Sequence, residues 1–144
     1  MQTITQYMSA EHQHCDSLFA DAETAAASDD LAAAQASFAA FHLEMEQHLS
    51  KEETILFPAF EQATGSRGGP TSVMRMEHGQ MRELFAEMKA ALDAGDTATY
   101  AGLSETLLIL MQQHNMKEEQ MLYPMADRAL REPGGIIGQM SEKK

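Results

Sequence analysis

Hydrophobic side chains recur along most of the chain at steps of three and four residues, which is the spacing of one face of an α-helix. Short polar or glycine-rich segments interrupt this pattern at Ser28–Asp30, Thr64–Pro70 and Asp93–Asp96. No stretch shows the sustained alternation that is typical of a strand. The pattern predicts four helices, over residues 2–27, 30–63, 70–94 and 96–131, with ends placed to within about 2–4 residues.

Each predicted helix carries one hydrophobic stripe. The four stripes are Ile4, Met8, Cys15, Leu18, Phe19, Ala22 and Ala26; Leu31, Ala34, Phe38, Phe41, Met45, Ile55 and Ala59; Met74, Met81, Leu84, Phe85, Met88 and Leu92; and Leu103, Leu107, Met111, Met121 and Met125. Short connections make sequential helices antiparallel, so we expect an all-α fold, an up-down-up-down four-helix bundle. Pro133-Gly134-Gly135 ends the last helix. We therefore expect one bundle domain over residues 1–132 and a frayed C-terminal tail over 133–144.

Composition supports this class and excludes several others. Valine occurs once and methionine 12 times, which favours helices over strands. The net charge of −12 argues against nucleic acid and anionic membrane surfaces as partners. Hydrophobic runs are shorter than the ~20 residues of a membrane span, and the N-terminal residues do not resemble a signal peptide. The single cysteine, Cys15, excludes an internal disulfide. We therefore expect a cytoplasmic protein.

The chain repeats itself with an offset of 66 residues. Over residues 8–61 against 74–127, 17 of 54 aligned pairs are identical. The matching segments include Glu11-His12 with Glu77-His78, and Gln47-His48 with Gln113-His114. They also include Lys51-Glu52-Glu53 with Lys117-Glu118-Glu119, and Leu56-Phe57-Pro58 with Leu122-Tyr123-Pro124. Each half is predicted to be one helical hairpin, and the two hairpins to be related by a pseudo-twofold axis.

Six polar residues stand where the stripes require core positions: His12, His48, Glu52, His78, His114 and Glu118. His12 and His48 each lie 18 residues from Asp30, so the hairpin returns them to the same level. His78 and His114 repeat this arrangement around Asp96. Each His-x-x-x-Glu pair shares one helical face. Buried ionisable groups require pairing or a metal, so the pattern predicts a single metal cavity.

The donor set suits iron, and also manganese or zinc. Two bridging carboxylates neutralise only part of the charge of two divalent ions, and an oxide or hydroxide bridge from water would supply the rest. Glu53 and Glu119 lie about 100° further round their helices, so we expect them to be solvated or to support the ligands from outside. The alternative is that one of them replaces its neighbour as a bridge. His14 and His42 lie off the stripes and are expected at the surface.

These residues resemble the hemerythrin-like HHE cation-binding domains. The resemblance covers residues 4–130 and rests on His12, His48-x-x-x-Glu52-Glu53-x-x-Leu-Phe-Pro58, His78 and His114-x-x-x-Glu118-Glu119-x-x-Leu-Tyr-Pro124. It implies a four-helix bundle with a non-haem di-iron centre. By resemblance, His12 and His48 would bind one iron, His78 and His114 the other, and Glu52 and Glu118 would bridge. Members carry oxygen, sense oxygen or redox state, or act in nitrosative stress and iron–sulfur repair.

The chain departs from the oxygen carriers at one position. The resemblance implies a further histidine one turn before the third-helix ligand, where this chain has Met74. A thioether is a poor ligand for ferric iron, so the site would be more open unless water, Glu77 or a tyrosine fills the position. The departure argues against long-lived oxygen storage.

Three functions follow from these observations. The first is a di-iron protein that binds or senses O2 or NO. The second is a redox or stress enzyme, or an iron donor, acting in peroxide turnover or iron–sulfur cluster repair. The third is a structural metal bundle. Ferritin-like oxidases need Glu-x-x-His on two helices. Here only Glu11-x-x-His14 fits, so that class is disfavoured.

Overall fold

The computed structural model describes residues 2–143, and all regular structure within that range is helical. The elements in chain order are α1 (Ile4–Ala27), α2 (Leu31–Lys51), the π-helical turn η1 (Glu52–Leu56), α3 (Phe57–Thr64), α4 (Pro70–Asp93), α5 (Thr97–Lys117), the π-helical turn η2 (Glu118–Leu122), α6 (Tyr123–Ala129) and α7 (Pro133–Glu142). The all-α prediction is confirmed. Because α2–η1–α3 and α5–η2–α6 each run without a break, this part of the chain has five helical stretches rather than the four expected.

The helices begin where the sequence indicates. The Asp30 carboxylate accepts the Ala33 N–H at 3.1 Å, and Asp96 accepts the Thr99 N–H at 3.0 Å. Each caps the first turn of the helix that follows it. The turns before them are equivalent as well, since Asp29 (φ 58°) and Gly95 (φ 71°) occupy the left-handed region 66 residues apart. The two halves of the chain therefore reverse direction in the same way.

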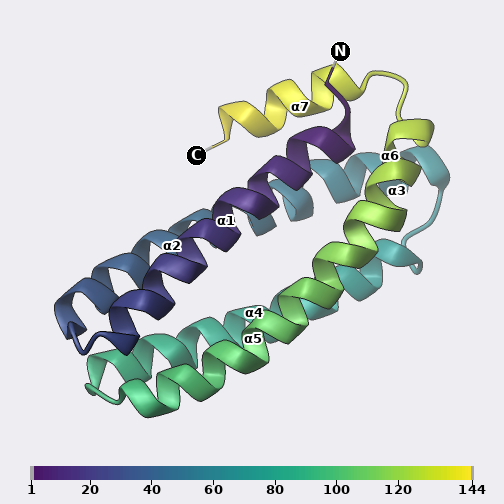
Figure 1. The fold of residues 1–144 in the computed structure, drawn as a ribbon. Coiled ribbons are helices and arrows are strands. Elements are labelled where there is room, and N and C mark those ends of the chain that lie inside the picture. Colours follow the sequence, from purple (N-terminus) through teal and green to yellow (C-terminus); the bar gives the residue numbers. More distant parts are fainter. Residues whose placement is uncertain (1, 144) are drawn as a thin grey trace.

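The helices pack as two adjoining pairs (Figure 1). Helix α1 lies along α2, and α4 lies along α5; α1 also contacts α5, and α2 contacts α4. Two hydrophobic clusters fill the interior. One surrounds Phe41 and Phe85 near the two short turns, and the other surrounds Phe57 and Tyr123 near α3, α6 and α7. In the sequence of α1 and α4, a histidine stands between the residues of one cluster and those of the other, so a polar layer separates them.

The π-helical turns change the face that each long helix buries. In η1, the Phe57 N–H donates to the Glu52 carbonyl, five residues back instead of four. Pro58 has no N–H and its ring crowds the carbonyl four residues back, so the wider turn accommodates it. The extra residue rotates the downstream face.

The fully buried positions beyond Glu52 and Glu118 are therefore shifted by one residue from those predicted, although Ile55 and Met125 still pack against the cluster in part. Leu56, Phe57 and Phe60 are buried in place of Ile55 and Ala59. In the second half Leu122, Tyr123 and Ala126 are buried in place of Met121 and Met125. The physical reason is the same in both halves, because η2 adds one residue as η1 does.

The expected fraying over residues 133–144 is also wrong for the described part of that segment. Pro133–Glu142 form α7, and Met140 is fully buried with Ile4, Met8 and Leu56. In Figure 1, α7 lies across the N-terminal end of α1. Pro133 therefore opens a new helix, as proline does readily at a first helical turn, besides following the end of α6.

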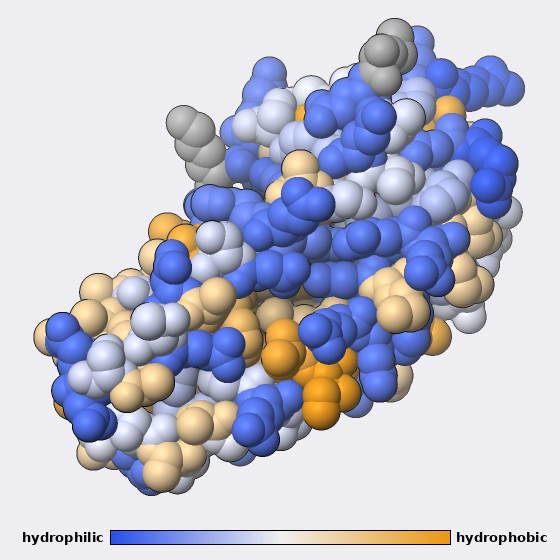
Figure 2. Space-filling view, in the orientation of Figure 1, coloured by the Kyte–Doolittle hydropathy of each residue, from blue (hydrophilic) through white to orange (hydrophobic). Residues whose placement is uncertain are grey.

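The face drawn in Figure 2 is mainly hydrophilic, with a compact hydrophobic group in the region of α4 and α5. Among the described residues, no helix is both long and hydrophobic enough to cross a membrane.

Candidate metal centre

The structure brings all six predicted site residues together in the polar layer between the two hydrophobic clusters. They are His12 on α1, His48 on α2, Glu52 in η1, His78 on α4, His114 on α5 and Glu118 in η2, and every one is buried. Ligand atoms of Glu52, His78, His114 and Glu118 lie within 4.8 Å of one another, as do those of His12, His48 and Glu118. The two groups share Glu118, so they form one cluster with two halves.

The carboxylates at the centre start the two π-helical turns. Glu52 Oε1 lies 3.1 Å from His78 Nε2, and Glu118 Oε1 lies 3.1 Å from His12 Nε2. Each glutamate therefore reaches from its own helix pair to a histidine of the other pair. This crossing places both carboxylates between the two halves, where a bridge between two metal ions would have to lie.

Four further carboxylates hold the histidines from outside. His12 Nδ1 lies 2.6 Å from the Glu119 carboxylate. The other three distances are all 2.8 Å, from His48 Nδ1 to Glu11, from His78 Nδ1 to Glu53 and from His114 Nδ1 to Glu77. A carboxylate at Nδ1 places the proton there and leaves Nε2 free as an acceptor or ligand. All four imidazoles are thus arranged to present Nε2 to the cluster.

These contacts bear on several expectations. Glu53 and Glu119 lie on the outer side of the imidazoles, which supports the expected role outside the ligand set and disfavours either as a bridge. Glu77, considered as a filler beside Met74, instead contacts His114 and Lys117. The roles of Glu11 and Glu77 were missed, although their repetition immediately before His12 and His78 was a signal.

Cations anchor three of the four outer carboxylates. Lys51 pairs with Glu11, and Lys117 pairs with Glu77 at 2.6 Å. Arg82 binds Glu53 through two contacts of 2.7 and 2.9 Å. The position equivalent to Arg82 in the first half is Asp16, and Asp16 and Glu119 line the same surface cavity, so a carboxylate stands there in place of a guanidinium. The outer contacts of the two halves therefore differ at this position, where Glu53 has a cationic partner.

Burial and these contacts shift the pKa values of the cluster. Burial lowers the pKa of His12, but hydrogen bonding and charge interaction with Glu118 outweigh it and raise the pKa to about 9. Burial also lowers the pKa of His114, but the charge of Glu118 outweighs this effect and raises the pKa to about 9. Burial and the charge of Glu118 raise the pKa of Glu52, whereas the pKa of Glu118 is lowered, against its burial, by Glu52 and His114. In the metal-free cluster His12, His114 and Glu52 therefore keep a proton more readily than in water, and Glu118 loses its proton more readily.

Three buried ligand atoms nevertheless make no hydrogen bond within the described residues: His48 Nε2, His114 Nε2 and Glu118 Oε2. Ion-pair distances remain, since His114 Nε2 lies 3.3 Å from Glu118 Oε2 and His48 Nε2 lies 3.5 Å from Glu52 Oε1. Unsatisfied buried polar atoms are costly unless a ligand or ion completes them. Imidazole nitrogens and carboxylate oxygens are also the donors that iron, manganese and zinc accept. The residues present therefore fit a buried transition-metal centre.

A seventh polar side chain enters the cluster. The Tyr123 hydroxyl, on α6, lies 2.7 Å from Glu52 Oε2, 2.8 Å from Glu118 Oε1 and 3.1 Å from His12 Nε2. Burial, followed by the charges of Glu118 and Glu52, raises the pKa of Tyr123 well above its ordinary value. Tyr123 was not predicted as a site residue, although its alignment with Phe57 in an otherwise matching motif was a signal.

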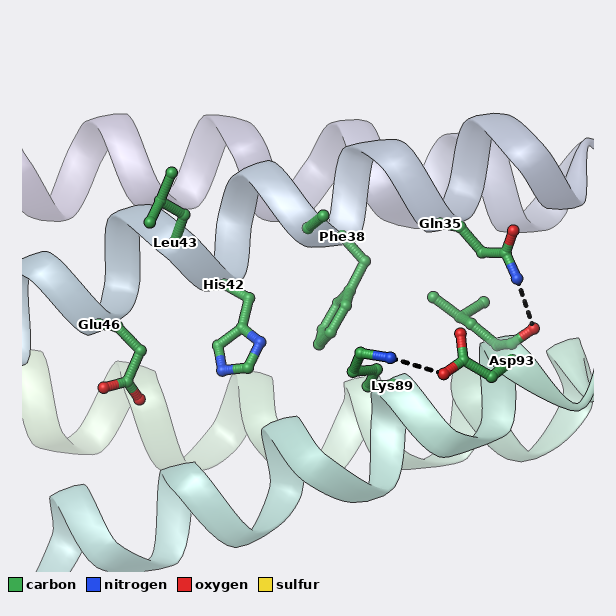
Figure 3. Close-up of a pocket in the computed structure, with 9 residues that line it drawn as sticks. Gln35, Phe38, His42, Leu43, Glu46, Lys89 and Asp93 are labelled. Atoms are coloured by element: carbon green, nitrogen blue, oxygen red, sulfur yellow. Dashed lines mark hydrogen bonds and ion pairs between the residues drawn. The ribbon is translucent and has the colours of Figure 1, made fainter.

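Two histidines stay outside the cluster, as expected. His14 is exposed, 3.9 Å from Glu44. His42 is only partly exposed, because its ring packs against Phe38 and Phe85. It lines a cavity of about 530 Å³ between α2 and α4, shown in Figure 3 with Lys89 and Asp93 opposite. None of the six cluster residues lines this cavity, so it is separate from the candidate metal centre.

Met74 and Cys15 are hydrophobic core residues. Met74 packs in the cluster around Phe57, one helical turn before His78. The Cys15 thiol is buried, and burial raises its pKa to about 12. Cys15 does not belong to the groups of donors that could hold a metal.

Comparison with known proteins gives a consistent result. The family model of the hemerythrin HHE cation binding domain matches residues 3–126. The iron-sulfur cluster repair protein YtfE of Edwardsiella ictaluri is 40% identical over 93 residues, which are 58% of this chain and 42% of that protein. YtfE of Enterobacter sp. is 38% identical over 95 residues, 59% of this chain and 43% of that protein. The chain thus matches less than half the length of these relatives. No solved structure matches.

Proposed function

Because the chain belongs to the hemerythrin HHE cation-binding domain family, we propose that its buried cluster holds two iron ions. His12 and His48 are assigned to one, His78 and His114 to the other, and Glu52 and Glu118 to both as bridges. An oxo or hydroxo bridge would supply the remaining negative charge. The observation that carries this proposal is the set of buried ligand atoms that make no hydrogen bond to any described residue, His48 Nε2, His114 Nε2 and Glu118 Oε2, at the centre of two equivalent halves.

We propose that the centre binds or senses O2 or NO. Iron in such a site supplies open coordination positions and one-electron chemistry. The protein's part is to hold the donors and exclude water: the outer carboxylates fix the imidazole orientation, and the hydrophobic clusters close the polar layer on both sides. Two fully buried side chains adjoin the histidines, Phe57 at His78 and Tyr123 at His12. A small, weakly polar molecule suits such surroundings.

A second candidate is a redox or stress function, either peroxide turnover or delivery of iron for iron–sulfur cluster repair. It is favoured by the relatives named iron-sulfur cluster repair protein and by the thioether of Met74 in place of an imidazole. Manganese or zinc would satisfy the same donors, and a zinc-filled bundle would be structural.

We also propose that residues 1–132 form one up-down-up-down bundle made of two duplicated hairpins. The equivalent left-handed residues Asp29 and Gly95, and the equivalent outer carboxylates Glu11 and Glu77, support a pseudo-twofold relation.

Metal analysis combined with absorption spectra tests these alternatives. The purified protein is analysed for iron, manganese and zinc, then reduced anaerobically and mixed with O2, NO or peroxide. Two irons per chain with spectral changes on adding O2 or NO support the first function. Two irons with rapid oxidation by peroxide, or rapid transfer to a chelator, support the second. One zinc per chain would refute both.

A further inference from the structure

The aromatic residues after the two π-helical turns break the symmetry of the cluster. Phe57 and Tyr123 are equivalent in the repeat, and each is fully buried against an equivalent histidine. The ring centroids are 5.6 Å apart both for Phe57 with His78 and for Tyr123 with His12. The two positions therefore differ mainly in the hydroxyl group of Tyr123, which adds an oxygen donor to only one half.

This oxygen lies where a ligand of the first half would lie. Tyr123 Oη, His12 Nε2 and Glu118 Oε1 are separated pairwise by 3.1, 2.8 and 3.1 Å. With metal–ligand bonds of about 2.0–2.2 Å, neighbouring donors in an octahedral site are about 3 Å apart. The three atoms thus have the spacing of one face of an octahedron around a single ion. Tyrosine oxygen is an iron ligand in haem proteins as well.

We propose that Tyr123 is a metal ligand, through its phenolate oxygen, of the iron(III) held by His12 and His48. This inference rests on the proposed di-iron function. On ligation the phenol O–H bond breaks, the O–Fe bond forms and the proton leaves to solvent. The second half has the Phe57 ring at the equivalent place and gains no such ligand. The two metal positions are therefore unlike, and the position at His78 and His114 is the more open one for a small ligand.

A phenolate bound to iron(III) has a visible charge-transfer band and enhances tyrosine ring modes in the resonance Raman spectrum. We expect both in protein loaded with iron(II), oxidised with ferricyanide and normalised to its iron content. Tyr123→Phe is expected to remove the band per iron. The matched control is Tyr100→Phe, because Tyr100 is also buried but packs in the other hydrophobic cluster.

A second variant keeps the test decisive if Tyr123→Phe folds poorly. The chain has three tyrosines, so Tyr7→Phe combined with Tyr100→Phe leaves Tyr123 alone. This variant must keep the band and the ring modes. Wild-type protein that holds two irons without a phenolate band would overturn the inference and leave the proposed function standing. Protein that holds no iron would overturn the proposed function itself.

Discussion

Replacing one of two neighbouring side chains on η2 tests the rotated face directly. Leu122 is 1% exposed and packs in the cluster with Phe57 and Tyr123, whereas Met121 is 59% exposed. An uninterrupted α-helix would instead continue the stripe of Met111, His114 and Glu118 through Met121. With the π-helical turn, Leu122→Ala should destabilise the protein and Met121→Ala should not. With an uninterrupted α-helix, the reverse is expected.

The size of the effect follows from burial. Truncation of a fully buried leucine to alanine costs about 2–5 kcal/mol, since it removes apolar contacts and leaves a cavity. Truncation of an exposed side chain changes stability by about 0.5 kcal/mol or less. A domain of this length loses roughly 2–4 °C in Tm per kcal/mol, so Leu122→Ala is expected to melt about 5–15 °C lower and Met121→Ala within about 2 °C of wild type.

The assay is urea and thermal unfolding followed by circular dichroism. Chelator is present in every sample, so that altered metal binding does not contribute to the difference. Leu56→Ala and Ile55→Ala extend the comparison to η1 with a smaller expected difference, because Leu56 is fully buried and Ile55 is partly buried against the same cluster. A loss for Met121→Ala as large as that for Leu122→Ala would refute the π-helical phase and restore the stripe expected from the sequence.

Four further predictions concern the metal centre. Chelation is expected to lower the Tm of the metal-loaded protein. A metal bound only to the native state raises the free energy of unfolding by about 4 kcal/mol at 1,000 times its Kd. A metal-free form with the same Tm as the loaded form would contradict a metal site in the core. His48→Ala is expected to lose most of one iron per chain and His14→Ala none, and equal iron loss by elemental analysis would reverse the assignment. In metal-free protein the native pKa of His12, about 9, exceeds its ordinary value. The contribution of protonated His12 to the free energy of unfolding is therefore complete below pH ~6.5 and is lost as pH rises through about 9. Urea unfolding at pH 7 and at pH 10 measures the difference. Met74→His is expected to add an imidazole on the His78 side and slow the reaction with peroxide, and unchanged stopped-flow rates would show that Met74 leaves no open position.

The fold class and the six buried polar residues could be predicted because helical phase is a local property. Within α2 one helical period runs from Leu31 to His48, so the stripe that holds Phe41 and Met45 also places His48 in the core. The prediction fails after Glu52, where Pro58 forces an extra residue into the turn. A periodicity that assumes a uniform helix has no means of registering that insertion.

The outer residues were less accessible to sequence reasoning because they depend on helix pairing. Glu11 supports His48 across a hairpin, and Glu119 supports His12 across the bundle. Tyr123 enters the cluster only because η2 rotates α6. The helix α7 was missed for a different reason: its three glycines and short length weaken the local pattern, and it packs against α1 and η1, where Met140 is buried.

The duplication has a consequence for how such a site can change. In a symmetric dimer of identical hairpins every substitution would appear twice, so a tyrosine at this position would bring two phenols into one cavity. Covalent fusion removes that constraint, because each half then mutates alone. At the metal cluster, two pairs of equivalent positions differ in this way. Tyr123 in one half corresponds to Phe57 in the other, and Arg82 corresponds to Asp16. The 66-residue repeat is thus what permits one cavity to offer two unequal positions.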